Sequence, residues 1–184
     1  LALVNDHGAA LCFDPAQLEL ATRAALWRRR PLAALGPDVM RAPLHLPGVV
    51  ARARRLAPAA PVVAALLDQS VACGIGNICA LEALHRVGVA PSRPLGAVDD
   101  PTLAVLFDVA AALLRRGIAR GRGPGRPARR VYGRGGRPCA RCGAPVSALR
   151  RGPAGRRTYW CPRCQPAEIP PGVTDPVDAP RGTE

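Results

Sequence analysis

Cys139-Ala-Arg-Cys142 and Cys161-Pro-Arg-Cys164 form two cysteine pairs with 18 residues between them. This spacing falls within the C-x2-C-x15–20-C-x2-C pattern of structural zinc sites. Each pair brings two thiolates to one side of a turn, and two such turns complete a tetrahedral shell with no open coordination position. The cysteines therefore predict one structural Zn2+, whose binding folds a segment too small to fold alone. Thioredoxin-like redox chemistry is disfavoured, because two pairs occur and no βαβ pattern surrounds them.

The sequence between the two pairs predicts a β-hairpin with a basic tip. Val146-Ser-Ala-Leu149 and Thr158-Tyr-Trp160 are expected to pair as strands, and residues 150–157, four of them Arg, to form the tip. A basic hairpin of this kind suits a DNA groove.

Apolar residues upstream of the finger recur at helical spacing, so the fold is expected to be mainly α with a small β part. Helices are predicted from Leu46 to Pro58, from 62 to about Ala72, from 77 to 88, and from Asp99-Asp100-Pro101 through Leu114. Asn77 is expected to cap the third helix, and the Asp-Asp-Pro sequence to start the fourth.

The N-terminal residues predict two short strands around the turn Asn5-Asp6-His7-Gly8. Because a lone hairpin is rarely stable, we expect them to be the last strands of a β-sandwich domain. A third strand is expected at 17–20, followed by a connector through Gly36-Pro37-Asp38. The sequence begins with Leu1 rather than Met, so we expect a fragment of a longer protein.

The charge pattern points to nucleic acid. The net charge is +13, all 26 basic residues are Arg, and fifteen of these lie between Arg115 and Arg163, where there is no Asp or Glu. The planar guanidinium group suits bidentate contact with phosphate. Codon bias explains the choice of Arg over Lys equally well, but it does not explain the clustering.

Several classes of protein are disfavoured by composition. No run of about 18 apolar residues occurs, so no membrane span is expected. Seven cysteines, four of them in C-x2-C pairs, fit metal ligation in a reducing compartment better than a disulfide framework. We expect a monomer in the cytoplasm.

A second motif is the segment Leu66-Leu-Asp-Gln69-Ser-Val-Ala-Cys-Gly74-Ile-Gly76-Asn77, which places a tight glycine turn before a helix. Unpaired backbone N–H groups at a helix N-terminus bind phosphate well. A plain turn without a ligand is an equally good explanation of this motif alone.

Taken together and in this order, the motifs resemble the family of formamidopyrimidine-DNA glycosylases and endonuclease VIII. The glycine turn is similar to the family's LLDQxxxxGIGN pattern, in a helix-two-turn-helix domain. The finger is similar to its VYGRxGxPCxxCG and GRxTxxCPxCQ patterns, through Val131-Tyr-Gly-Arg134, Gly136-Arg-Pro138, Gly155-Arg156-Arg-Thr158 and the four cysteines. The resemblance covers roughly residues 1–166.

The resemblance implies roles for individual residues. Asn77 and Arg156 would hold the phosphates beside a lesion while the damaged nucleotide is flipped out, and Gly74 and Gly76 would shape the turn. Gln69 and Glu82 would position helices. The Arg157 side chain is expected to be only solvated charge.

The family's chemistry requires an N-terminal Pro nucleophile, a neighbouring Glu and a Lys on a β-domain loop. This sequence contains no Lys, and none of the three is expected here, so no catalytic residue is assigned in this chain. The parent protein would be a bifunctional glycosylase and abasic-site lyase acting on oxidised bases.

Three departures from the pattern favour the endonuclease VIII branch and oxidised pyrimidines. Cys79 stands where Tyr is usual, Cys73 occupies a small-residue position, and the linker before the finger is short, which leaves little room for a base-capping loop.

The expected domains are 1–40 (β-sandwich remnant and connector), 41–122 (helix-two-turn-helix domain), 123–166 (basic linker and zinc finger) and 167–184 (disordered tail). The resemblance implies that the partner is double-stranded DNA with an oxidised base or abasic site, and that the protein is bacterial and associated with the nucleoid. Two alternatives stay open: a non-catalytic binder of abasic or distorted DNA, and an RNA-binding zinc-ribbon protein.

Overall fold

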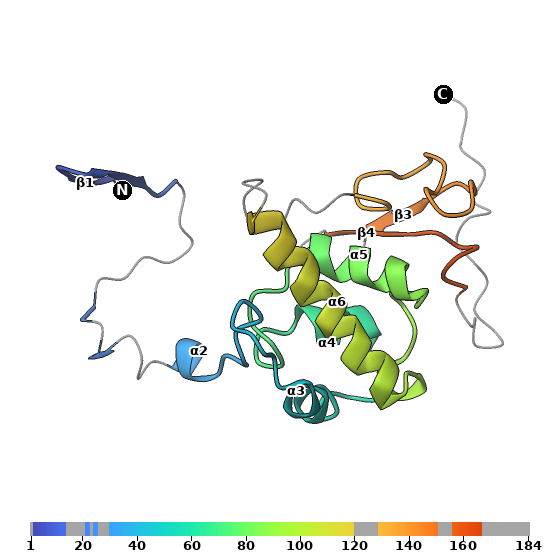
Figure 1. Ribbon diagram of the computed structural model, residues 1–184, viewed down its shortest axis with the longest axis horizontal. Coiled ribbons are helices and arrows are strands. Elements are labelled where there is room, and N and C mark those ends of the chain that lie inside the picture. The colour runs from blue at the N-terminus through green and yellow to red at the C-terminus, as the bar shows by residue number, and fades with distance from the viewer. Residues whose placement is uncertain are drawn as a thin grey trace. The chain divides into compact units, whose positions relative to one another are not determined.

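The computed structural model describes residues 2–13, 21–22, 24–25, 30–119, 129–150 and 156–166 (Figure 1). The chain forms two compact units, one through Ala34 and one from Leu35 onward. The predicted strand at 17–20, most of the basic linker, the finger tip at 151–155 and the predicted disordered tail lie outside the described residues.

The first unit contains the predicted hairpin. Strands β1 (Ala2–Asn5) and β2 (Gly8–Leu11) pair antiparallel, with Ala2 opposite Leu11 and Asn5 opposite Gly8. The Asn5 side chain stabilises the turn, since its Oδ1 accepts a hydrogen bond from the His7 N–H at 2.9 Å. Helix α2 (Arg30–Ala33) follows. That the hairpin belongs to a β-sandwich stays a prediction.

The second unit contains the predicted helices and the second hairpin. Its elements are α3 (Leu46–Ala53), α4 (Val62–Leu67), α5 (Asn77–Val87), the 3-10 helix η1 (Leu95–Ala97), α6 (Asp100–Ala119), β3 (Ser147–Arg150) and β4 (Arg157–Trp160). Strands β3 and β4 pair antiparallel, with Ser147 opposite Trp160 and Arg150 opposite Arg157. The mainly helical fold with a small β part is confirmed.

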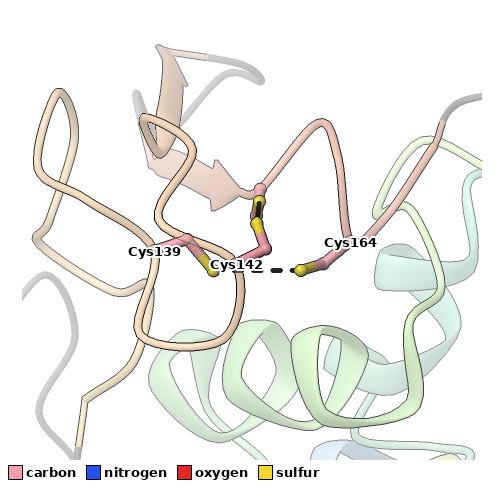
Figure 2. Close-up of side chains that lie close together, drawn as sticks. Cys139, Cys142 and Cys164 are labelled. Carbon is pink, nitrogen blue, oxygen red and sulfur yellow. Dashed lines mark hydrogen bonds between the residues drawn. The ribbon is translucent and has the colours of Figure 1, made fainter.

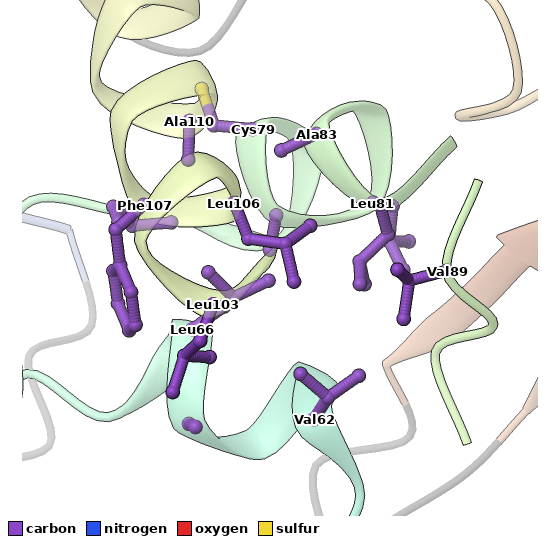
Figure 3. Close-up of a cluster of buried hydrophobic side chains, with 14 of the residues drawn as sticks. Val62, Leu66, Cys79, Leu81, Ala83, Val89, Leu103, Leu106, Phe107 and Ala110 are labelled. Carbon is purple, nitrogen blue, oxygen red and sulfur yellow. The ribbon is translucent and has the colours of Figure 1, made fainter. Parts of the chain in front are cut away.

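The longest helix, α6, starts where the Asp-Asp-Pro sequence predicts. Asp99 Oδ1 accepts a hydrogen bond from the Thr102 N–H at 2.7 Å, which satisfies one of the N–H groups left open at a helix start. The apolar face of α6 packs against α5 and α3. Figure 3 shows Leu103, Leu106, Phe107 and Ala110 of this face among buried side chains of α4 and α5. No helix in the described part of the chain is long and apolar enough to cross a membrane.

Helix α4 ends at Leu67, five residues before the predicted end. The helix ends there because a side chain competes with helical carbonyl groups for a backbone N–H. Asp68 has extended backbone angles, and its Oδ1 accepts hydrogen bonds from the Ser70 N–H at 2.8 Å and the Ser70 hydroxyl at 2.6 Å. Asp and Ser thereby form a turn instead of a further helical turn.

The prediction that Asn77 caps the third helix is wrong. Gly76 occupies the N-cap position, Asn77 is the first helical residue, and no side chain caps this N-terminus. The end of α5 is as predicted: Gly88 has a left-handed backbone (φ 88°), and its N–H donates to the Leu84 carbonyl.

The helices and the finger share one hydrophobic core. Val131, Val146 and Tyr159, from the finger region, are buried in the same cluster as Leu81 and Leu84 of α5. Because the finger contributes to the helical core, its packing depends on α5.

Candidate zinc centre and nucleic-acid interface

The four predicted zinc ligands lie together. The sulfur atoms of Cys139, Cys142, Cys161 and Cys164 are all within 4.8 Å of one another. Figure 2 shows Cys139, Cys142 and Cys164 converging from the two turns of the finger. The Cys139–Cys164 Sγ distance is 3.9 Å and the Cys142–Cys161 Sγ distance is 3.5 Å. Four thiolates bound to one zinc ion at about 2.3 Å have Sγ atoms about 3.8 Å apart, so these residues fit one tetrahedral Zn2+.

The thiols of this cluster differ in acidity. Burial raises the pKa of Cys139, but hydrogen bonds from the Arg141 and Cys142 N–H groups, the His85 ring and Cys161 outweigh it, so the pKa falls to about 6. Burial and the neighbouring thiols raise the pKa of Cys164 to about 12. Zinc binding therefore has to displace protons from this cluster, because only thiolates ligate the metal.

A buried glutamine supports the second cysteine turn. The Gln165 Oε1 accepts a hydrogen bond from the Cys161 N–H at 3.0 Å, and its Nε2 donates to the Val89 carbonyl at 2.8 Å. Val89 lies two residues after the end of α5. The sequence analysis missed this link, because a Gln after a cysteine pair carries no signal of its partner.

The buried carboxylate of Glu82, on α5, holds the chain that leads into the finger. Its oxygens accept hydrogen bonds from the backbone N–H groups of Arg130, Val131 and Tyr132 at 2.8–3.0 Å. A carboxylate with several charge-assisted hydrogen bonds tolerates burial. Glu82 thus fixes α5 relative to the finger.

The glycine turn is organised by Gln69. Its Nε2 donates to the carbonyls of Leu67 (3.0 Å) and Ile75 (3.1 Å), and its Oε1 accepts from the Gly74 N–H at 2.9 Å. Gly74 has φ of 105°, which L side chains rarely adopt. One amide side chain therefore closes the turn that leads into α5.

The connector also contacts this turn, which sequence reasoning did not foresee. The Gly36 N–H donates to the Gln69 carbonyl, and Cys73 pairs with the connector on both sides: its N–H donates to Pro37 O and its carbonyl accepts from Val39 N–H. At Gly36, an added Cβ would lie 2.5 Å from the Val71 carbonyl oxygen. Only glycine allows this close approach.

Asn77, one of the predicted phosphate-binding residues, contacts the backbone of the finger next to Arg156, another of them. The Asn77 side-chain amide donates to the Arg157 carbonyl at 3.0 Å, and Arg156, the preceding residue, is exposed. An added Cβ at Gly76 would meet no atom within 4 Å, so the surface beside the start of α5 is open. The site offers an amide, a guanidinium group and helix N-terminal N–H groups.

Two family models match the chain. One, described as "Formamidopyrimidine-DNA glycosylase H2TH domain", matches residues 35–126, and the other, "Zinc finger found in FPG and IleRS", matches residues 136–167. They cover the helical module and the zinc finger.

Curated relatives carry the same family name. A formamidopyrimidine-DNA glycosylase of Geobacillus kaustophilus is 36% identical over 151 residues, covering 75% of this chain and 54% of the relative. One of Paracoccus denitrificans is 35% identical over 185 residues, covering 90% of this chain and 63% of the relative. The chain therefore spans little more than half the length of the relatives it matches.

Solved structures agree with these relatives. The MutM (FPG) protein of Thermus thermophilus has a TM-score of 0.64 and 35% identity, covering 76% of this chain and 57% of that chain. A complex of Lactococcus lactis Fpg with abasic-site DNA has a TM-score of 0.61 and 25% identity, covering 73% and 52%. Assignment to the endonuclease VIII branch stays a prediction.

Proposed function

Because the chain belongs to the formamidopyrimidine-DNA glycosylase family, we propose that it is the DNA-binding part of a base-excision repair glycosylase. In this proposal the chain binds, as a monomer, duplex DNA that contains an oxidised base or an abasic site. The parent enzyme would remove the base and cleave the strand.

The observation that carries the proposal is the hydrogen bond between the Asn77 amide and the Arg157 carbonyl. It joins the start of α5 to strand β4, so Asn77 contacts the residue that follows Arg156 in the chain. A primary amide has two N–H donors, so one remains for a ligand after the bond to Arg157 is made. Asn77 and Arg156 would then hold the phosphates that flank the lesion.

The start of α5 adds further donors. The first helical hydrogen bond is donated by the Ala80 N–H to the Gly76 carbonyl, so the N–H groups of residues 77–79 have no carbonyl partner within the helix. With no capping side chain, these groups and the positive end of the helix dipole favour an anion. Gly74 and Gly76 would let the backbone approach a phosphate closely.

The surroundings of the site supply positive charge. The finger and the segment leading into it, residues 129–166, contain ten Arg and no Asp or Glu. Binding of several phosphates by these cations would release counterions, so the affinity should fall steeply with salt.

For the damaged base, we propose an oxidised pyrimidine. Only nine residues separate the end of α6 at Ala119 from Arg129, a linker too short for a large base-capping loop. The damaged nucleotide would be flipped out of the base stack, as enzymes that act on bases require. Asn77 and Arg156 would bind the phosphates on either side of it.

No residue of this chain is assigned to bond cleavage. The chain contains no Lys, and the four thiolates leave no open position on a zinc ion, which supplies folding energy and no reaction chemistry. In this proposal the chain binds damaged DNA without forming a covalent intermediate.

The test is fluorescence anisotropy of the 184-residue chain with duplexes that carry a tetrahydrofuran abasic-site analogue, an oxidised pyrimidine, an oxidised guanine or no lesion, and with RNA of the same sequence. We expect tighter binding to the lesion duplexes, the pyrimidine lesion ahead of the guanine, with steep salt dependence. A preference for RNA would support the zinc-ribbon alternative and contradict the proposal.

Borohydride trapping on a natural abasic-site duplex tests the chemical part separately. We expect a shifted band on a native gel and no covalent band on a denaturing gel. A covalent adduct would show that this chain contains a nucleophile and is catalytic by itself.

A further inference from the structure

His85 lies on the last turn of α5 and is fully buried, although nothing in the DNA-binding proposal uses it. Its Nε2 is 3.3 Å from the Sγ of Cys139, a predicted zinc ligand 54 residues later in the chain. Burial of an imidazole in a core of Ala, Val and Leu is unfavourable unless a polar partner is present. The Cys139 sulfur is that partner.

Zinc ligation decides the direction of this hydrogen bond. A cysteine bound to zinc is a thiolate, which has no proton and only accepts. Nε2 must therefore carry the proton and donate. Nδ1 has no hydrogen-bond partner in the described part of the chain, so Nε2 is the ring nitrogen that makes the polar contact.

We propose that His85 is an outer-shell donor of the zinc centre. Its Nε2–H bonds to the Cys139 thiolate and thereby fixes that ligand and slows the loss of zinc. The Arg141 backbone N–H, at 3.4 Å, is a second and longer donor to the same sulfur. Through His85, α5 supports a zinc ligand, in addition to its contacts with the chain around the finger.

A hydrogen bond from a buried side chain to a metal ligand, as proposed for His85 and Cys139, is a common feature of metal sites. Hydrogen bonds from outer-shell groups orient ligands, and their loss typically weakens metal affinity 10- to 100-fold. A bond from α5 to one thiolate also makes metal retention depend on the helix. Zinc retention does not depend on which DNA the chain binds, so a zinc-release assay tests the role of His85 independently of the proposed DNA substrate.

The first experiment measures zinc release from the 184-residue chain into a colorimetric chelator. The variants are His85→Phe, which keeps an aromatic ring but has no donor, and His85→Gln, whose Nε2 reaches a similar distance from the backbone. His45→Phe, at an exposed position, is the control.

We expect release to be about 10-fold faster or more in His85→Phe, near the unmodified rate in His85→Gln, and unchanged in His45→Phe. Circular dichroism should show the same helix content in all four proteins. Equal release from the Phe variant and the unmodified chain would overturn the proposal, as would a Gln variant that behaves like Phe.

The second experiment needs no substitution and so does not depend on whether a variant folds. Long-range 1H–15N NMR spectra of the zinc-loaded chain report which nitrogen of each imidazole carries the proton. We expect the proton of His85 on Nε2, with His7 and His45, both exposed, as internal references. A proton on Nδ1 of His85 would exclude it as a donor to Cys139.

Discussion

The side-chain amide of Asn77 donates a hydrogen bond to the backbone carbonyl of Arg157 across 80 positions of sequence. The contact connects the turn before α5 with strand β4 of the finger. Because of this contact, the start of α5 and strand β4 lie next to each other on the protein surface. This arrangement requires the finger to be folded.

The first prediction concerns this surface. We expect Asn77→Ala and Arg156→Ala each to weaken binding to an abasic-site duplex by about 10-fold, since a hydrogen bond to a charged group contributes roughly 1.5–3 kcal/mol. Zinc content should not change. Arg157→Ala is the matched control, because Arg157 contributes its backbone carbonyl to the contact with Asn77. Anisotropy titrations at several salt concentrations measure both affinity and salt dependence.

Arg156→Ala should also reduce the salt slope by about one counterion, whereas Asn77→Ala should leave it unchanged. If both variants bind as tightly as the unmodified chain, neither side chain holds phosphate.

The second prediction concerns the buried carboxylate. Glu82→Ala would leave the N–H groups of Arg130, Val131 and Tyr132 without their acceptor. Of the three, only the Val131 N–H bond is fully buried. At roughly 1–3 kcal/mol for that group and less for the two partly buried ones, we expect a loss of about 2 kcal/mol or more in the free energy of unfolding. Urea denaturation of the zinc-loaded protein measures it. Asp108→Asn, at an exposed position whose carboxylate lies 4.0 Å from Arg115, should cost less than about 0.5 kcal/mol.

The third prediction is the effect of removing zinc. Cys161→Ser, or treatment with a chelator, should unfold the finger and abolish lesion-dependent DNA binding, because β4 then no longer holds Asn77. Cys73→Ser, outside the metal cluster, should retain both zinc and binding. Metal analysis alongside anisotropy checks this prediction, and lesion-dependent binding by the metal-free chain would contradict it.

The fourth prediction follows from a thiol in the core. Burial, with a smaller effect of the Glu82 carboxylate, raises the pKa of Cys79 to about 11. A raised pKa keeps the unreactive thiol form to higher pH, so at pH 8 only about one Cys79 in a thousand is a thiolate. We expect iodoacetamide to leave Cys79 unmodified in the folded chain at pH 8 and to modify it in urea, as peptide mass spectrometry would show. Rapid labelling of the folded chain would mean that Cys79 is accessible.

The elements that the sequence predicted are those with local causes. The start of α6 follows from Asp99 and Pro101, the end of α5 from Gly88, and the zinc centre from the spacing of four cysteines. In each case the residues that determine the feature lie within a few positions of one another, or follow a spacing that metal geometry imposes.

The features that the sequence did not predict depend on distant partners. Asn77 was expected to cap its own helix, but its side-chain amide donates a hydrogen bond to the Arg157 carbonyl instead. His85 belongs to no sequence motif, because Cys139, its partner, is 54 residues away. The pairing of Cys73 with the connector likewise joins two segments that are distant in sequence. The hydrogen-bond partners of such residues are distant in sequence and can be identified only from the three-dimensional structure.

The last prediction separates the two glycines of the turn. Gly74 has φ of 105°, and an added Cβ would lie 3.1 Å from a methyl group of Val39, so Gly74→Ala should lower the free energy of unfolding by about 1 kcal/mol or more and weaken DNA binding as well. Gly76 has extended backbone angles (φ −101°, ψ 173°) and open space where a Cβ would stand. Gly76→Ala should therefore unfold like the unmodified chain yet bind the abasic-site duplex more weakly, because its methyl group would stand where a phosphate approaches the start of α5. Urea denaturation and anisotropy on the same two variants distinguish the cases. Unchanged affinity in Gly76→Ala would place the bound phosphate elsewhere.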